Sequence, residues 1–332
     1  MIQTRELTKF YGSLAALNRL TIDIGPGEVF GFIGPNGAGK TTTMKILACL
    51  IQPDRGNASV AGFDIAKDAD AVRRNIGYMP DFLGVYDDLT VDEYLQFFAA
   101  AFGISRKNRG AIIGQVLELT DLTFKRHALV DSLSRGMQQR LGVARVLVHD
   151  PKVLFLDEPA SGLDPRARIE MRSLLQELGK MGKTLLVSSH ILSELAEMCT
   201  SIGIIERGTL LYAGSIQDAY ERTRQRSDIA ERIAVTLETT SSPASLIAAR
   251  FASDDRIAKC TADDTARTLT IDVKNIPAPQ TTDASAAPLA PAFSHHFLIE
   301  TIIASGGRIA SFQPEQVRLE DAFLKLTTGA VQ

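Results

Sequence analysis

The segment that most constrains this chain runs from residue 34 to residue 42 and reads Gly-Pro-Asn-Gly-Ala-Gly-Lys-Thr-Thr. It has phosphate-loop spacing, in which a glycine is followed after four residues by Gly-Lys-Thr. An apolar run precedes it at residues 29–33, and a helical pattern follows at residues 41–51. Glycines let backbone N–H groups approach a polyphosphate closely, and a helix N-terminus attracts an anion. The arrangement therefore predicts a nucleotide site rather than a chance match.

The residue types within this loop predict individual roles. We expect Lys40 to reach the β- and γ-phosphates. The Thr41 hydroxyl is predicted to bind Mg²⁺, and Thr42 adds a further donor. The other loop residues predicted to hold the nucleotide are Gly34, Asn36, Gly37 and Gly39.

A second apolar run, at residues 153–156, ends in two adjacent carboxylates, Asp157 and Glu158. Such a run is typical of a parallel strand buried on both faces. Asp157 is predicted to hold Mg²⁺ through a coordinated water. Glu158 is predicted to be catalytic, polarising a water for attack on the γ-phosphate. The alternative is a solvated pair of surface acids, which the phosphate loop in the same chain disfavours.

Composition limits the other classes of function. The chain has 332 residues, of which 45% are hydrophobic, enough for one large domain and a smaller one. Its apolar stretches are interrupted well before the ~18 residues that a membrane span needs. A net charge of −3, with no basic blocks, argues against a nucleic-acid partner. We expect a cytoplasmic protein without direct membrane insertion, whose three distant cysteines are reduced packing residues.

The order of strand and helix patterns predicts two domains. Strands alternate with helices over residues 1–215, which indicates an α/β sheet domain. An antiparallel lid precedes the phosphate loop, with one strand expected at residues 20–24. A helical subdomain is inserted at about residues 82–145, and Thr90 with Glu93 is predicted to cap its first helix.

A small accessory α+β domain is expected at residues 216–332. We predict a helix or linker at residues 221–232, strands at 233–237, 268–273 and 308–312, and a helix at 297–305. The Pro- and Ala-rich stretch at about residues 277–293 is expected to form a flexible loop.

Five motifs, in their order and spacing, resemble those of ATP-binding-cassette ATPases. They are the segments 34–42, 133–140, 154–159, 161–164 and 188–190. The resemblance covers residues 1–215 and implies the P-loop NTPase cassette fold, a mixed sheet with flanking helices, an antiparallel β subdomain and the inserted helical subdomain. It also implies that ATP and Mg²⁺ are the cofactors and that the chain hydrolyses ATP.

The resemblance assigns further residues that spacing alone leaves open. Tyr11 would stack on adenine, where a strand-end core aromatic is the alternative. Ser134 and Gly136 would meet ATP on the opposing subunit, and Asp164 would belong to the loop that links the two sites. His190, otherwise an ordinary strand-end histidine, would contact the γ-phosphate as a catalytic residue. These roles imply a head-to-tail homodimer that drives a separate integral-membrane permease.

Two positions depart from the usual family pattern. The segment 133–140 carries Arg135 and Met137 where Gly and Gln are commonest, although its Ser-x-Gly core is intact. Asp81 stands where the family has a glutamine, and its carboxylate keeps an oxygen for Mg²⁺ or water. The alternative is that Asp81 is a solvated loop residue after Pro80.

The end of the chain suggests a group within the superfamily. Residues 318–327 and the Ser-Arg-Gly-Met sequence resemble ATPase subunits of bacterial exporters of drugs, polysaccharides or lipids. We therefore expect a subunit that powers export from the inner face of the cell membrane, where it is peripheral. The alternatives are an importer subunit, or a soluble cassette ATPase acting in translation or DNA repair.

Overall fold

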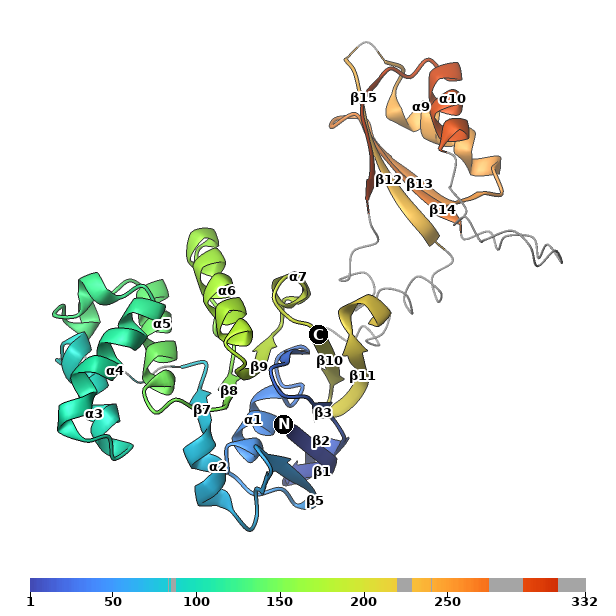
Figure 1. Cartoon of the computed structure of the whole chain (residues 1–332). Coiled ribbons are helices and arrows are strands. Elements are labelled where there is room, and N and C mark those ends of the chain that lie inside the picture. Colours follow the sequence, from blue (N-terminus) through green and yellow to red (C-terminus); the bar gives the residue numbers. More distant parts are fainter. Residues whose placement is uncertain (83, 85–87, 220–228, 240, 275–294, 316–332) are drawn as a thin grey trace, which may run out of the picture. The chain divides into compact units, whose positions relative to one another are not determined.

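The computed structural model describes residues 1–82, 84, 88–219, 229–239, 241–274 and 295–315. The chain divides into two compact units, shown in Figure 1. The first comprises Met1–Ile216, and the second lies within Gln217–Lys325. Within the described residues, none of the helices combines the length and the apolar character needed to cross a membrane.

The centre of the first unit is a six-stranded sheet. Its order is β11 (Thr209–Ser215), β10 (Ser201–Glu206), β4 (Val29–Ile33), β9 (Thr184–Ser189), β8 (Val153–Leu156) and β7 (Ile76–Met79). The pairings from β10 to β7 are parallel, and β11 is antiparallel to β10. Every residue of β4, β8 and β9 is buried, which explains the apolar sequences of β4 and β8 and the apolar centre of β9. The carboxyl ends of these parallel strands therefore meet at one edge of the sheet.

A smaller sheet forms the antiparallel part of this unit. Its strands are β1 (Ile2–Tyr11), β2 (Leu14–Leu20), β3 (Asp23–Ile24), β5 (Arg55–Val60) and β6 (Phe63–Asp64). The single strand expected at residues 20–24 is wrong, because two strands end and begin there. The Thr4 hydroxyl donates to the Leu20 carbonyl (3.0 Å) and accepts from the Ile22 N–H (2.9 Å). At the break between β2 and β3, this side chain of β1 makes hydrogen bonds in place of the ladder that β1 forms with each of them.

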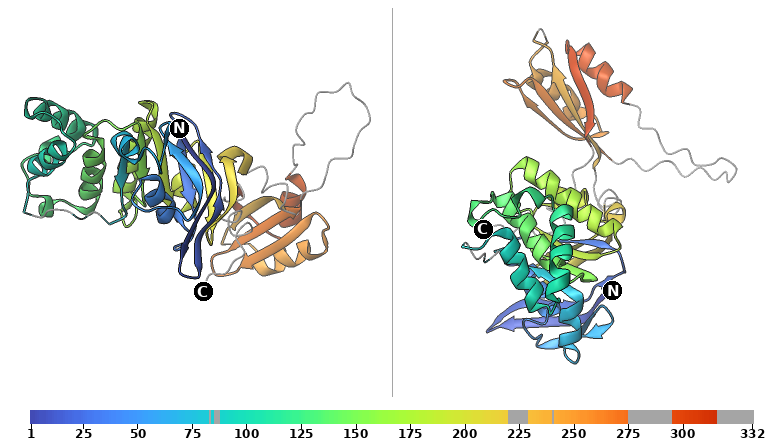
Figure 2. Two further views of the ribbon diagram at one scale, coloured as in Figure 1. Left: turned by 90° about the horizontal axis from the view of Figure 1, so that it is seen from below. Right: turned by 60° about the vertical axis from the view of Figure 1, so that its left-hand side comes forward.

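Helices flank the large sheet and form a separate cluster (Figures 1 and 2). Those associated with the sheet are α1 (Lys40–Leu47), α2 (Ala69–Asn75), α6 (Pro165–Lys180) and α7 (Leu192–Ala196). The cluster contains α3 (Val91–Ala101), α4 (Arg106–Leu119), α5 (Arg135–Leu147) and the short 3₁₀ helices Thr123–Lys125 and Val130–Ser132. The predicted cap is confirmed, since Thr90 and Glu93 form a reciprocal capping box at the start of α3.

An aromatic contact joins the helical cluster to the sheet. Phe102, which follows α3, stacks on His149 with ring centroids 3.7 Å apart and an interplanar angle of 8°. His149 Nε2 lies 2.8 Å from the carbonyl oxygen of Ile76, the first residue of β7. Burial in this contact lowers the pKa of His149 below its ordinary value of 6.5.

This contact predicts acid sensitivity. Because the folded state disfavours imidazolium at residue 149, the stabilisation is complete above pH 6.5 and declines as the pH falls below it. We expect His149→Phe to lose less unfolding free energy than wild type between pH 7 and pH 5. The difference should stay below ~1.4 kcal/mol per pH unit, the limit for one proton. Urea titrations at each pH measure it, and the exposed His127→Phe serves as control. Parallel losses in all three proteins would contradict the prediction.

The second unit has the order β-α-β-β-α-β. Its elements are β12 (Ile229–Leu237), α9 (Ala244–Arg250), the 3₁₀ helix Phe251–Ser253, β13 (Ile257–Asp263), β14 (Thr268–Lys274), α10 (His296–Ala304) and β15 (Ile309–Glu315). The sheet order is β13-β14-β12-β15, and every neighbouring pair is antiparallel. This is the ferredoxin-like split arrangement. Buried residues of both helices, including Ile247, Leu298 and Ile302, pack on one face of the sheet.

Some of the elements predicted for this unit are confirmed, one is partly wrong, and two were missed. The strands expected at 233–237, 268–273 and 308–312 and the helix at 297–305 are present. The helix or linker expected at 221–232 is wrong for residues 229–232, which belong to β12 because they pair with β14. Helix α9 and strand β13 were not predicted. The loop expected at 277–293 and the tail segment 318–327 lie outside the described residues.

Candidate functional site

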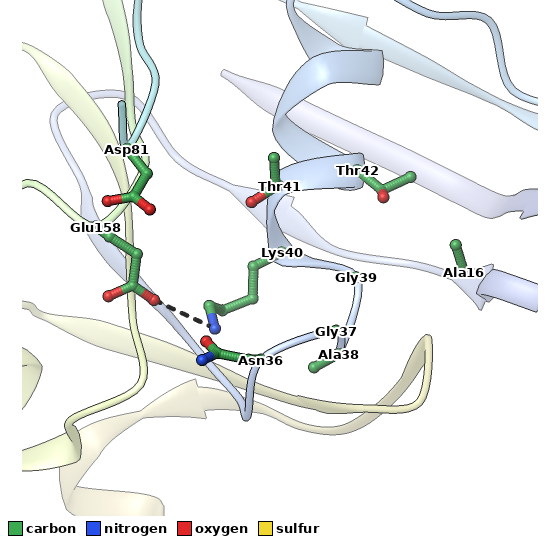
Figure 3. Close-up of a pocket in the computed structure, with 10 residues that line it drawn as sticks. All are labelled: Ala16, Asn36, Gly37, Ala38, Gly39, Lys40, Thr41, Thr42, Asp81 and Glu158. Atoms are coloured by element: carbon green, nitrogen blue, oxygen red, sulfur yellow. Dashed lines mark ion pairs between the residues drawn. The ribbon is translucent and has the colours of Figure 1, made fainter. Parts of the chain in front are cut away.

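A polar cavity lies where β4 passes into α1. Its lining comprises Ala16, Asn36, Gly37, Ala38, Gly39, Lys40, Thr41, Thr42, Asp81 and Glu158. Figure 3 shows the two carboxylates on one side of this cavity and the loop with the start of α1 on the other. The fold thus brings residues more than a hundred positions apart in sequence to one site.

Two glycines fix the path of the loop. Gly39 precedes α1 with φ at +111°, and a Cβ there would lie 2.5 Å from the carbonyl oxygen of Ala16. A Cβ on Gly34 would lie 2.2 Å from the carbonyl oxygen of Ile205. Both contacts involve backbone atoms that cannot rotate away, so only glycine fits at these positions.

Lys40 is the central cation of the cavity. Its side chain is only 6% exposed. Its Nζ donates to the carbonyl oxygen of Gly34 at 2.6 Å and to that of Pro35 at 3.3 Å. The same atom lies 3.3 Å from Glu158 Oε1, which is within ion-pair distance although the geometry is not that of a hydrogen bond. Lys40 is therefore held between the loop and the carboxylate.

Asp157 and Glu158 follow β8, and Ser188 at the end of β9 connects them. The Ser188 hydroxyl donates to Asp157 Oδ1 at 2.6 Å and accepts from the Glu158 N–H at 2.9 Å. Asp157 is 1% exposed, and its Oδ2 has no hydrogen-bond partner among the described residues. Sequence reasoning gave Ser188 no role, although it belongs to the recognised segment 188–190.

Glu158 lies between two nitrogen groups. Its Oε2 is 2.9 Å from His190 Nδ1, while Oε1 faces Lys40. The residue has φ at +50°, a left-handed conformation that is uncommon outside glycine. The 12% exposure of its side chain leaves it accessible only from the cavity side. The contacts with Lys40 and His190 therefore fix the orientation of the Glu158 carboxylate at the cavity.

Asp81 adds a third acid to this region. Desolvation by burial raises its pKa, and the charges of Asp157 and Glu158 raise it further, while Arg135 and His190 oppose the shift. Burial, with Asp157 and Asp81, also raises the pKa of Tyr78 to about 12. The unpaired oxygen of Asp157 is buried next to this region. Among the described residues, no group of three or more His, Cys, Asp or Glu side chains could hold a metal ion by itself.

Six predicted residues are not among the described residues that line the cavity. Gly34 and His190 contact residues that line it, and Asp157 directly precedes one of them. The other three are Tyr11, Ser134 and Gly136. Tyr11 ends β1 with 51% exposure, so the alternative of a core aromatic is wrong. Lys9 Nζ lies 5.9 Å from the centroid of its ring. The ring is free to stack on a planar group.

The remaining two residues form the start of α5. The Ser134 hydroxyl caps this helix by accepting from the Met137 N–H at 3.4 Å. A Cβ on Gly136 would come within 2.8 Å of Ala167 Cβ, so the glycine permits close packing against α6. A Cβ on Gly162 would lie only 2.5 Å from the central carbon of the Arg135 guanidinium. The segment 161–164 and the start of α5 are thus in contact.

The comparison with protein families gives one match. The sequence profile described as "ABC transporter" matches residues 17–161. This range contains the phosphate loop, the start of α5 and the two carboxylates after β8.

Curated relatives extend the similarity beyond that range. The chain is 43% identical over 212 residues to the bacitracin transport ATP-binding protein BcrA of Bacillus licheniformis, covering 64% of this chain and 68% of the relative. It is 41% identical over 214 residues to a Nod factor export ATP-binding protein of Burkholderia orbicola, covering 64% and 70%.

Solved structures share the fold of the first unit. An ATP-binding subunit of an ABC transporter matches with a TM-score of 0.61 and 29% identity, over 68% of this chain and 95% of that one. The dimeric structure of MJ0796, a bacterial ABC transporter cassette, matches with a TM-score of 0.60 and 26% identity, over 65% and 99%.

Proposed function

Because the chain belongs to the ABC transporter family as an ATP-hydrolysing subunit of the exporter type, we propose that it powers export through a separate integral-membrane permease. The observation that carries this proposal is the meeting of the phosphate loop with Glu158 in one cavity. The relatives named for bacitracin transport and Nod factor export favour an exporter over an importer. They equally disfavour a soluble ATPase of translation or DNA repair.

The loop would hold the triphosphate of ATP. Asn36, Gly37 and Gly39 line the cavity, and Gly34 begins the same loop. The backbone N–H groups of these residues would bind the phosphates. Lys40 would turn from Glu158 to the β- and γ-phosphates of ATP. A bond from the ammonium group to a charged phosphate oxygen is stronger than its present bond to the Gly34 carbonyl oxygen. Thr42 supplies a further hydroxyl donor.

Mg²⁺ would bind beside the loop. Thr41, Asp81 and Asp157 supply hydroxyl and carboxylate oxygens, with Asp157 acting through a water. The unpaired buried oxygen of Asp157 and the raised pKa of Asp81 both support a cation here. When bound, the ion would neutralise charge on the phosphates during transfer.

Glu158 is proposed to orient and deprotonate the attacking water. Its carboxylate is fixed by the backbone bond to Ser188 and by His190, and the same histidine would contact the γ-phosphate. Among the described residues that line the cavity, only Glu158 combines a carboxylate, low exposure and a place on the wall opposite Thr41 (Figure 3). General base catalysis requires this combination.

A second copy of the chain would complete the site. Ser134 and Gly136 form an anion-binding helix start that is not part of this copy's cavity. In a head-to-tail homodimer they would meet the ATP bound by the partner copy, and Asp164 would lie in the segment that links the two sites. The dimeric cassette among the similar structures supports this arrangement. Tyr11 would stack on the adenine ring.

The partner is proposed to be a multispanning permease, with this chain peripheral on the cytoplasmic face of the cell membrane. No nucleic acid and no direct membrane insertion are proposed. The net charge of −3 argues against a nucleic-acid partner.

The test is co-purification of the tagged full chain from its own cell membranes. We expect a multispanning membrane protein at equal stoichiometry, and ATP hydrolysis that rises when the pair is reconstituted in lipid. The Lys40→Ala variant should still bind the membrane protein but show no stimulated hydrolysis. Association with ribosomes or DNA instead, with no membrane partner, would overturn the proposal.

Asp81 offers a specific test of the metal proposal. Asp81→Gln removes a charge but keeps an oxygen, so hydrolysis should stay within about tenfold of wild type, ~1.4 kcal/mol of barrier. The Mg²⁺ concentration for half-maximal rate should fall, because less repulsion must be offset. Asp81→Ala should cost more, chiefly in hydrolysis stimulated by the permease. Equal Mg²⁺ dependence and equal stimulation in all three proteins would show that Asp81 is an ordinary loop residue.

A further inference from the structure

One edge of the sheet in the second unit is formed by β13, which has no partner on its outer side among the described residues. Strand β13 is the first in the order β13-β14-β12-β15, so among the described residues only β14 pairs with it. From Lys259 to Asp263 its register with β14 advances without a shift, so the backbone is regular over five residues. Alternate N–H and C=O groups of this segment point away from the sheet and can bind another strand.

The opposite edge of the same sheet is protected. Strand β15 carries Pro314, which lacks an N–H and lies opposite Ile233 of β12. Strand β13 contains no proline, and three of its five exposed side chains, Ala258, Thr261 and Ala262, are small. A further strand can therefore pair more readily with the β13 edge of the sheet than with the β15 edge.

The charges on β13 are arranged for self-pairing. Lys259 and Asp263 are both exposed and lie on the face opposite the helices, with Thr261 midway between them. If two β13 strands run antiparallel about a two-fold axis at Thr261, each Lys259 faces the other copy's Asp263. Opposite charges directly across a strand pair stabilise it, whereas like charges destabilise it.

The two charged groups are free to make this contact. Lys259 forms no ion pair with any residue that the structure describes. Asp263 Oδ1 accepts from the N–H groups of Thr265 (2.8 Å) and Ala266 (2.9 Å), which fixes the carboxylate and leaves Oδ2 open. On the other face of the strand, Cys260 would meet Ala262 of the second copy, and both side chains are small.

We propose that two copies of this chain associate through β13, joining their four-stranded sheets into one continuous antiparallel sheet with Thr261 at its two-fold axis. The contact lies in the second unit and contains none of the nucleotide-site residues. The proposed β13 contact therefore does not depend on whether the chain binds ATP or powers export. The charge pattern favours a second copy as the partner, because the same sequence in reverse places an opposite charge across from both Lys259 and Asp263.

Disulfide cross-linking of the nucleotide-free full chain tests the register. The parent is Cys260→Ser, and Thr261→Cys is added to it, because Cα atoms directly opposite in an antiparallel pair are about 4.5–5.5 Å apart, within disulfide range. At about 100 µM chain, since one strand pair is weak, mild oxidation should cross-link Thr261→Cys at least tenfold faster than Gln313→Cys on the β15 edge. Equal rates at the two edges would overturn the proposal.

Charge reversal tests the recognition itself. Lys259→Asp and Asp263→Lys should each slow cross-linking through position 261 at least tenfold, because each places like charges opposite one another twice per dimer. The double variant should restore the rate, since the pairs are then reversed but still complementary. Far-ultraviolet circular dichroism of every variant is the control for folding. Failure of the double variant to recover, or single charge variants that cross-link as fast as the Cys260→Ser, Thr261→Cys protein, would exclude the proposed pairing.

Discussion

Glu158→Gln is expected to lower ATP turnover by at least about 100-fold, ~2.7 kcal/mol of barrier, while ATP binding is retained. The amide has the shape of the carboxylate but cannot take a proton. Lys40 loses an anionic neighbour 3.3 Å away and keeps its bonds to the loop carbonyls, so it stays in place to bind phosphate. ATP that binds and is not hydrolysed should trap the proposed homodimer.

Two measurements check this expectation. Phosphate release gives turnover, and size-exclusion chromatography with Mg·ATP gives the oligomeric state. Glu177→Gln is the matched control, because Glu177 is an exposed glutamate of α6 paired only with Lys180 among the described residues, and it should behave as wild type. A Glu158→Gln protein that hydrolyses ATP normally, or that loses ATP affinity and stays monomeric, would remove Glu158 from the role of base.

Lys40→Ala is expected to weaken ATP binding about 100-fold, ~2.7 kcal/mol. The lysine is nearly buried and already aimed across the loop, so its loss removes a charge-assisted bond to phosphate. It also leaves Glu158 without its cation, which adds repulsion against the triphosphate. Both effects act in the same direction.

Lys45→Ala provides the control for charge on the same helix. Lys45 is exposed on α1, one and a half turns from the loop, and its removal should change ATP affinity less than twofold. Fluorescence titration with a labelled ATP analogue measures both variants. Similar losses in Lys40→Ala and Lys45→Ala would mean that general charge, and not a positioned lysine, accounts for binding.

The sequence was most informative where one physical requirement restricts the residue. Gly34 and Gly39 are recognisable because backbone carbonyls exclude any side chain there, and Val153–Leu156 because a doubly buried strand admits only apolar residues. Thr90 and Glu93 indicate a helix start because their side chains form the reciprocal hydrogen bonds of a capping box. Each of these signals can be read from a short segment of sequence, even where the atom that requires it, such as the Ile205 carbonyl oxygen beside Gly34, lies far away in the chain.

Expectations failed where distant contacts decide the local structure. The break between β2 and β3 depends on the hydroxyl of Thr4, sixteen residues before Leu20. Strand β13 carries no strong alternation and exists because β14 pairs with it. Residues 229–232 have a mixed composition that permits helix or strand, and pairing with β14 makes them strand.

For the site, the sequence by itself determined the phosphate loop, the paired carboxylates and the order of the motifs, because these depend on residue type and short spacing. Only the tertiary structure decided how they meet. The parallel order of β7, β8 and β9 places Asp81, Glu158 and Ser188 at one edge, and packing holds Glu158 at a positive φ between Lys40 and His190. No short-range pattern encodes these contacts, since their energy comes from strands that pair across long stretches of chain.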